Sequence, residues 1–272
     1  MRLRTTSTQR TYRYVRLAIV GATVFLAISV GLELGGGGDL ASVSASYYTS
    51  AGPVFVGALS AIALALLALS GRSLEQGLLD IAAVLLLVVT FVPTTLDCVA
   101  VGASCVPPEV RPTVVNNAVS VASIVVVGTV AAGILARTQG TATRGVAWTI
   151  AVIATLVVGG ALWAVAAPES FLAAAHTVAA VAFFSLIAVV AAIAAWRPHR
   201  SGVGVAYAVV AAAMVLTLIL LAVGMLVGLE NAGFPVVLVG ESVALVLFAV
   251  FWIVQTVELW NDPDPTLRAN RE

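Results

Sequence analysis

A few polar side chains interrupt long apolar stretches of this sequence, and they are the groups with which the chain could do chemistry. His176 and Glu241 could act as base and acid or contact a ligand, and Asn116 and Asn117 could donate and accept hydrogen bonds. An ionisable group inside a bilayer costs about 3 kcal/mol or more unless it is paired or hydrated, so each is a candidate for function.

The spacing of these residues predicts one polar layer at a single depth. His176 and Glu241 each follow the start of an apolar run by a few residues, which places both roughly 10 Å below the same surface at 1.5 Å per residue. A polar stripe with steps of three and four enters from that side, a helical spacing formed by Thr113, Asn116, Ser120 and Ser123. The expected pocket residues are His176, Glu241, Asn116, Asn117, Ser120, Ser242, Tyr47 and Tyr48.

Four interpretations of this layer stay open. Buried hydrogen bonds between helices are a common structural use of Asn, Ser and His. The function that we favour is a non-enzymatic pocket in the outer leaflet that binds or passes a lipid or a small amphiphile. A membrane-embedded lipid hydrolase or transferase would use Glu241 and His176 as acid and base. An accessory subunit would instead place the layer against the helices of another membrane protein.

The elements that must carry these residues are transmembrane helices. Hydrophobic residues make up 61% of the 272 and charged residues only 10%, whereas a soluble domain carries about 25% charged residues. Eight apolar runs predict an all-α bundle of eight spans, at 15–33, 53–70, 77–93, 112–136, 145–167, 170–196, 203–228 and 235–257. The expected organisation is an Arg-rich terminus over 1–14, the transmembrane domain over 15–257 and a tail over 258–272.

The distribution of arginine predicts the orientation. All 13 basic residues are arginine, and with eight spans only Arg111 falls on the side opposite to the termini. Both termini are therefore expected in the cytoplasm of a multi-pass protein of the cell membrane. Because 13 acidic residues balance the charge, no nucleic acid is expected as a partner. The expected partners are membrane lipids and, as an alternative, another membrane protein.

The first apolar run has a second interpretation. Arginines, an apolar run and the small residues Val43, Ser44 and Ala45 resemble a secretory signal with its cleavage site. The run is long, and about a dozen residues separate it from that site, so we expect an uncleaved first helix. Cleavage would leave seven spans.

Cys98 and Cys105 are the only cysteines, and both lie in the loop between the third and fourth runs. The predicted topology exposes this loop to an oxidising compartment, where two nearby thiols usually form a disulfide. Two thiols without a nearby histidine make a poor metal site, so we expect no metal and no cofactor.

One internal repeat is visible at an offset of 60 residues. It aligns Asn116 with His176 and Arg137 with Arg197. The offset predicts two related helical hairpins, the fourth run with the fifth and the sixth with the seventh.

Several short motifs resemble a family of bacterial membrane proteins, the domain-of-unknown-function 998 family. They are Ser44, Ser46, Tyr47, Tyr48 and Thr49, then Phe55-Val56-Gly57, His176 with Phe183-Phe184, and Glu241-Ser242 with Trp252. The loop before the second run is also similar in placement to that of the DRAM-like family. The resemblance implies a polytopic helical membrane protein without an assigned activity. Relatives often carry a charged pair before Phe-Val-Gly, where this chain has Gly52-Pro53.

Overall fold

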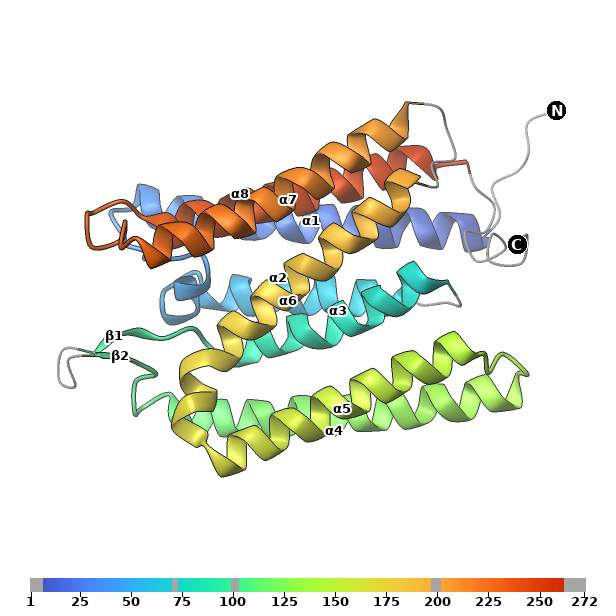
Figure 1. The fold of residues 1–272 in the computed structure, drawn as a ribbon, viewed down its shortest axis with the longest axis horizontal. Helices are drawn as coiled ribbons and strands as arrows, with labels where there is room; N and C mark the ends of the chain where they lie inside the picture. Colours follow the sequence, from blue (N-terminus) through green and yellow to red (C-terminus); the bar gives the residue numbers. More distant parts are fainter. Residues whose placement is uncertain (1–6, 70–72, 99–102, 197–201, 262–272) are drawn as a thin grey trace.

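The computed structural model describes residues 7–69, 73–98, 103–196 and 202–261, and this part of the chain is a bundle of long helices (Figure 1). The helices are α1 (Ser7–Gly35), α2 (Gly52–Ala68), α3 (Leu74–Phe91), α4 (Arg111–Thr138), α5 (Arg144–Ala166), α6 (Pro168–Trp196), α7 (Val203–Leu226) and α8 (Val236–Glu258). A short 3-10 helix, η1 (Ser44–Tyr48), precedes α2, and a two-stranded ribbon of β1 (Leu96–Cys98) and β2 (Ala103–Cys105) follows α3. The expected helical bundle is confirmed, with the ribbon as an addition.

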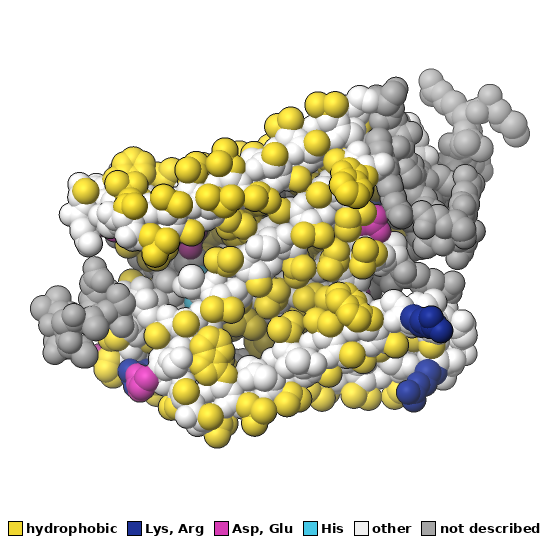
Figure 2. All heavy atoms as spheres, in the orientation of Figure 1, with side chains coloured by type: hydrophobic (Ala, Val, Ile, Leu, Met, Phe, Trp, Pro, Cys, Tyr) yellow, Lys and Arg dark blue, Asp and Glu magenta, His cyan; other side chains and the backbone are white. Residues whose placement is uncertain are grey.

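The helices coincide with the predicted apolar runs, and all but one are long enough to cross a bilayer. Seven helices have the length and hydropathy of membrane spans, and α2, with 17 residues, is shorter. This composition is that of a multi-pass membrane protein. Large apolar side chains cover the outside of the bundle, as Figure 2 shows, because hydrocarbon rather than water surrounds it.

Local chemistry explains where the helices begin. Pro112 and Pro168 occupy first turns, where a missing N–H costs no hydrogen bond, and Glu169 places a negative charge at the positive end of α6. The Ser73 side chain accepts from the Gln76 backbone while Gln76 caps Ser73 in return, which fixes the start of α3.

The main core joins six helices. Residues of α1, α2, α3, α6, α7 and α8 form one buried cluster that includes Ile19, Ile62, Ile187, Met214 and Trp252. Figure 1 shows α6 crossing the bundle obliquely, from the α4–α5 hairpin towards α7. The α4–α5 hairpin packs at the side through a small cluster of Ile81, Val84, Val125 and Ile153.

The start of α1 and the end of α8 lie at the same end of the bundle. The Arg13 guanidinium donates through Nε to the Trp260 carbonyl at 2.6 Å and lies 4.6 Å from the centre of its ring. At the opposite end, Arg111 forms a bidentate ion pair with Glu169, with N–O distances of 2.7 and 2.9 Å. This pair fastens the start of α4 to the start of α6.

Candidate functional site

A cavity of about 40 Å³ lies within the main core, and six segments line it. Its wall is made of Leu26 from α1, Val43 and Ser44 before α2, Phe55, Leu59 and Ile62 from α2, Leu86 and Val89 from α3, Ala180, Phe183 and Phe184 from α6, and Glu241, Leu245 and Phe248 from α8. Glu241 is the one ionisable residue of this wall, and Ser44 is its one hydroxyl. The cavity is therefore an apolar chamber with a single polar corner.

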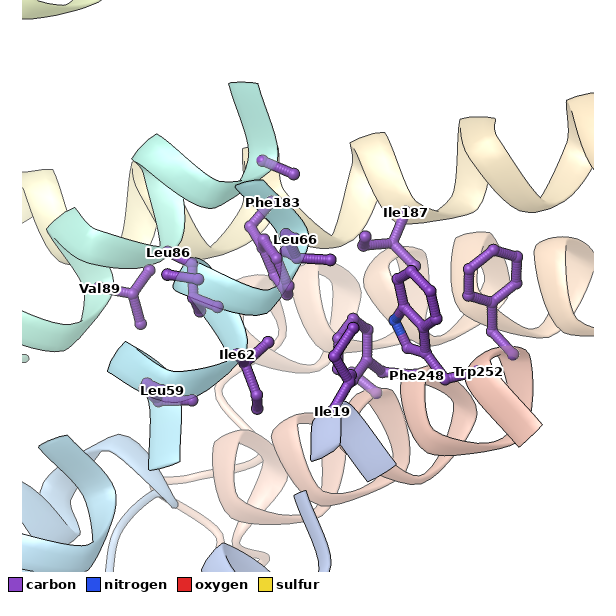
Figure 3. Packing of buried hydrophobic residues seen from close by; sticks show 14 of the residues in the cluster. Ile19, Leu59, Ile62, Leu66, Leu86, Val89, Phe183, Ile187, Phe248 and Trp252 are labelled. Atoms are coloured by element: carbon purple, nitrogen blue, oxygen red, sulfur yellow. The ribbon is translucent and has the colours of Figure 1, made fainter. Parts of the chain in front are cut away.

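Figure 3 shows how the apolar part of this wall is built. Leu59 and Ile62 of α2 and Leu86 and Val89 of α3 project from neighbouring helices towards the space that Phe183 enters from α6. Helical spacing explains the pairs, since residues three apart lie on one face of a helix. Figure 2 shows a hollow between α6 and the α7–α8 pair, with an acidic side chain visible inside it.

The polar corner is a hydrogen-bonded pair. The Ser44 backbone N–H donates to Oε2 of Glu241, and the Ser44 hydroxyl donates to Oε1, both at 2.9 Å. Ser44 is 6% exposed. Two donors from one residue hold the carboxylate in a fixed orientation, and bonds to a carboxylate are about twice as strong as neutral ones.

Two tyrosines of η1 lie beside this region. The Tyr47 ring packs edge-on against Phe55 with centroids 6.5 Å apart, and its side chain hydrogen-bonds to that of Asn117 on α4. The Tyr48 hydroxyl donates to the Thr94 carbonyl at 2.7 Å. Burial raises the pKa of both tyrosines, and the neighbouring Tyr47 charge raises that of Tyr48 further. Both phenols are therefore neutral.

His176 is buried at 4% exposure and has a partner of its own. Its Nδ1 lies 2.7 Å from the carbonyl of Val92, so this nitrogen carries the proton and donates. Its Nε2 is buried and has no hydrogen-bond partner among the described residues. Among the described residues no hydrogen bond joins His176 to Glu241; Val92 is the partner of the imidazole and Ser44 is a partner of the carboxylate.

The remaining candidates lie away from the cavity wall. Asn116 and Ser120 are exposed on α4, where the Ser120 hydroxyl donates to the Asn116 carbonyl at 2.8 Å. Ser242 is half-buried beside Glu241 and is not among the lining residues. Residues of η1 thus contact two of the candidates, since Ser44 bonds to Glu241 and Tyr47 bonds to Asn117. The exposed residues Asn116 and Ser120 of α4 do not line the cavity.

The ribbon after α3 carries the cysteines. Its antiparallel register pairs Leu96 with Cys105 and Cys98 with Ala103, so the two cysteines occupy diagonal positions on one face. The side chain of Cys98 lies outside the described residues, and the disulfide stays a prediction.

Sequence reasoning missed a polar cluster at the other end of the bundle. The Tyr207 hydroxyl donates to Oε2 of Glu258 at 2.7 Å, and both residues are buried. Arg16 of α1 is 4% exposed and near enough to act electrostatically on Tyr207. Arg16 and Glu258 lie at the ends of apolar runs, where a charged residue normally reaches water, so their sequence positions gave no signal of burial.

The described residues hold no group of three His, Cys, Asp or Glu side chains placed to bind a metal ion. Comparisons of the chain with protein-family models, curated proteins and solved structures found no match. The cavity and its polar corner are therefore the observations on which a function rests.

Proposed function

We propose that this protein binds a small amphiphile in the cavity between α1, α2, α3, α6 and α8. The observation that carries the proposal is the pairing of an apolar chamber with one fixed carboxylate. Binding sites for small molecules are mostly apolar, with a few polar groups that fix the orientation of the ligand. An amphiphile matches this division, because its polar end can meet Glu241 while its apolar end contacts the phenylalanines.

The cavity supports binding better than a purely structural role. A space for one water needs about 10–15 Å³, so a space of about 40 Å³ exceeds that minimum about threefold. A closed structural cluster would fill such a space with side chains, because voids in a core cost stability. The cavity is also only partly enclosed by the protein, so a ligand can enter it.

The same geometry favours binding over acid–base catalysis. A catalytic pair would need Glu241 and His176 within hydrogen-bond reach of each other or of one substrate atom. Each side chain has instead a separate partner, Ser44 for the carboxylate and Val92 for the imidazole.

The proposed topology has eight spans with both termini in the cytoplasm of a cell membrane. At 1.5 Å per residue the 17 residues of α2 extend about 26 Å, close to the roughly 30 Å of a hydrocarbon core. The contact between Arg13 and Trp260 supports an even number of crossings. Because arginines collect on the cytoplasmic side, the polar corner belongs to the outer half of the bilayer.

Filling the cavity tests this function, and two adjacent residues of α6 provide a matched comparison. Ala180 lines the cavity, and Val181 is 41% exposed on the outer surface. Native mass spectrometry of wild-type protein released from its membrane should detect a retained small molecule. Ala180→Phe should abolish that adduct, and Val181→Phe should keep it. An adduct that survives Ala180→Phe, or wild-type protein that carries none and takes up no added amphiphile, would refute binding in this cavity.

A further inference from the structure

We infer that the ligand of this cavity is a hydrophobic cation, an amphiphile whose polar end is a protonated amine or a quaternary ammonium. The inference rests on the proposed binding function and specifies the chemistry of the ligand. It follows from the charge, the ring geometry and the size of the cavity.

The one ionisable side chain in the cavity wall is acidic. Glu241 is the only ionisable side chain among the lining residues, and no arginine or histidine joins them. Within the described residues, the partners of its carboxylate are Ser44 and the Val43 backbone, which are neutral donors rather than basic groups. A carboxylate in low-dielectric surroundings is stabilised far more by a cation than by a neutral donor. A bound cation would supply the counter-charge that the protein itself does not provide.

The geometry of the carboxylate leaves room for such a partner. Its two oxygens offer about four acceptor positions in total. Ser44 donates to both oxygens and the Val43 backbone donates a third hydrogen bond, so about one position remains for a ligand. These bonds also fix the orientation of the carboxylate before a ligand arrives, which reduces the entropic cost of binding.

Four phenyl rings supply the rest of the recognition chemistry. Phe55, Phe183, Phe184 and Phe248 come from three different helices and all line the cavity. Phe183 lies 5.0 Å from Phe184 at an interplanar angle of 71° and 5.6 Å from Phe248 at 51°. Rings at such angles are not stacked face to face, and all four border the cavity. A cation over an aromatic face gains about 0.5–2 kcal/mol, and rings around an ammonium group are a known way to bind it.

The volume limits which part of the ligand lies inside. A space of about 40 Å³ suits a compact headgroup of a few heavy atoms rather than a whole acyl chain. Because the cavity is only partly enclosed, the chain of the ligand would extend out of it. Anionic lipids are excluded by the same arrangement, since a phosphate next to Glu241 would place two negative charges together without a basic residue between them.

Three probes with the same ten-carbon chain separate charge from hydrophobicity. Radiolabelled decyltrimethylammonium, decanol and decyl sulfonate are each titrated against purified protein in a non-ionic detergent. We expect the cation to bind at least tenfold more tightly than the alcohol, and the sulfonate to bind more weakly than either. This order is measured on the wild type alone, so it tests the inference even if a variant fails to fold.

Two charge-removing variants then locate the selectivity. Glu241→Gln should bring the affinities for the cation and the alcohol within about threefold of each other, since only the charge of the wall has changed. Glu169→Gln removes an acid that is paired with Arg111 and lies away from the cavity, so it should keep the full preference.

The outcomes distinguish the two proposals. Equal affinity of the wild type for the cation and the alcohol, or a preference that survives Glu241→Gln, overturns cation selectivity while leaving amphiphile binding in place. Absence of binding for all three probes overturns both. Cation binding that Ala180→Phe leaves unchanged shows that the cation binds elsewhere, and it too overturns the inference.

Discussion

Ser44 and Glu241 are 197 positions apart in the chain, yet both oxygens of the Glu241 carboxylate accept a hydrogen bond from Ser44 at 2.9 Å. The contact joins the segment before α2 to the second turn of α8. It closes the polar corner of the cavity and fixes how the start of α8 lies against the first third of the chain.

A double-mutant cycle measures the worth of this contact. Hydrogen bonds to a charged group contribute about 1.5–3 kcal/mol, so Ser44→Ala should lower the free energy of unfolding by about that amount. The effect of Ser44→Ala should largely disappear in a Glu241→Gln background, because the charged acceptor is gone. Ser120→Ala is the control, since that hydroxyl is exposed and bonds only within α4. Fully additive effects of the two changes in detergent unfolding experiments would show that the residues act independently.

The corner between η1 and α2 requires glycine at position 52. A Cβ on Gly52 would lie 2.6 Å from the carbonyl oxygen of Tyr47, whereas a Cβ on Gly57 of the same helix meets nothing within 4 Å. Gly52→Ala should therefore lower the melting temperature by several degrees, and Gly57→Ala should leave it unchanged or raise it slightly. Thermal unfolding of the two variants checks this, and equal melting temperatures would mean that the corner adapts without cost.

The tyrosines of η1 predict a loss of stability in alkali. Burial raises the pKa of Tyr48 above its ordinary value of 10.0, so its contribution to stability is complete below pH 10 and declines as the unfolded state ionises above it. Tyr48→Phe should be less stable than the wild type at pH 8, because the bond to Thr94 is lost, and should lose less stability between pH 9 and 11. Melting curves across this pH range test the difference. Parallel pH profiles for the two proteins would exclude Tyr48 as the cause.

The topology predicts which positions an impermeant maleimide reaches in intact cells. In a background of Cys98→Ser and Cys105→Ser, Ser170→Cys and Asn231→Cys should react, since both lie at the end proposed to be extracytoplasmic. Thr8→Cys and Gln139→Cys should react only after the membrane is opened. All four positions are exposed, so differences in labelling report the side of the membrane. Labelling of Gln139→Cys in intact cells would reverse or break the assigned orientation.

The ribbon predicts a bond between Cys98 and Cys105. The two residues occupy diagonal positions across β1 and β2, and their loop faces an oxidising compartment in the proposed topology. Mass spectrometry of unreduced peptides from protein alkylated directly in the membrane should show them linked. Removing the bond by Cys105→Ser should cost little stability, because the loop that it closes is short. Recovery of both cysteines in alkylated form would rule the disulfide out.

The sequence by itself determined that the protein is a bundle of apolar helices, and it determined which residues of the chain each helix contains. Hydropathy suffices for this, because a backbone in lipid must satisfy its own hydrogen bonds and a helix does so within one segment. It also singled out Glu241 and His176, since an ionisable residue within an apolar run is visible without knowing its neighbours. In the structure each has a hydrogen-bond partner: Glu241 on α8 bonds to Ser44, and His176 on α6 bonds to Val92.

Only the tertiary structure decided which helices are neighbours and so which polar groups meet. Asn116 and His176 are equivalent in the 60-residue repeat, yet Asn116 is exposed and His176 is buried against Val92. Glu241 meets Ser44 rather than His176 for the same reason. Hydropathy records how deep a residue lies along its helix, whereas the rotation of each helix and the order of the helices around the bundle depend on side-chain packing between segments far apart in the chain.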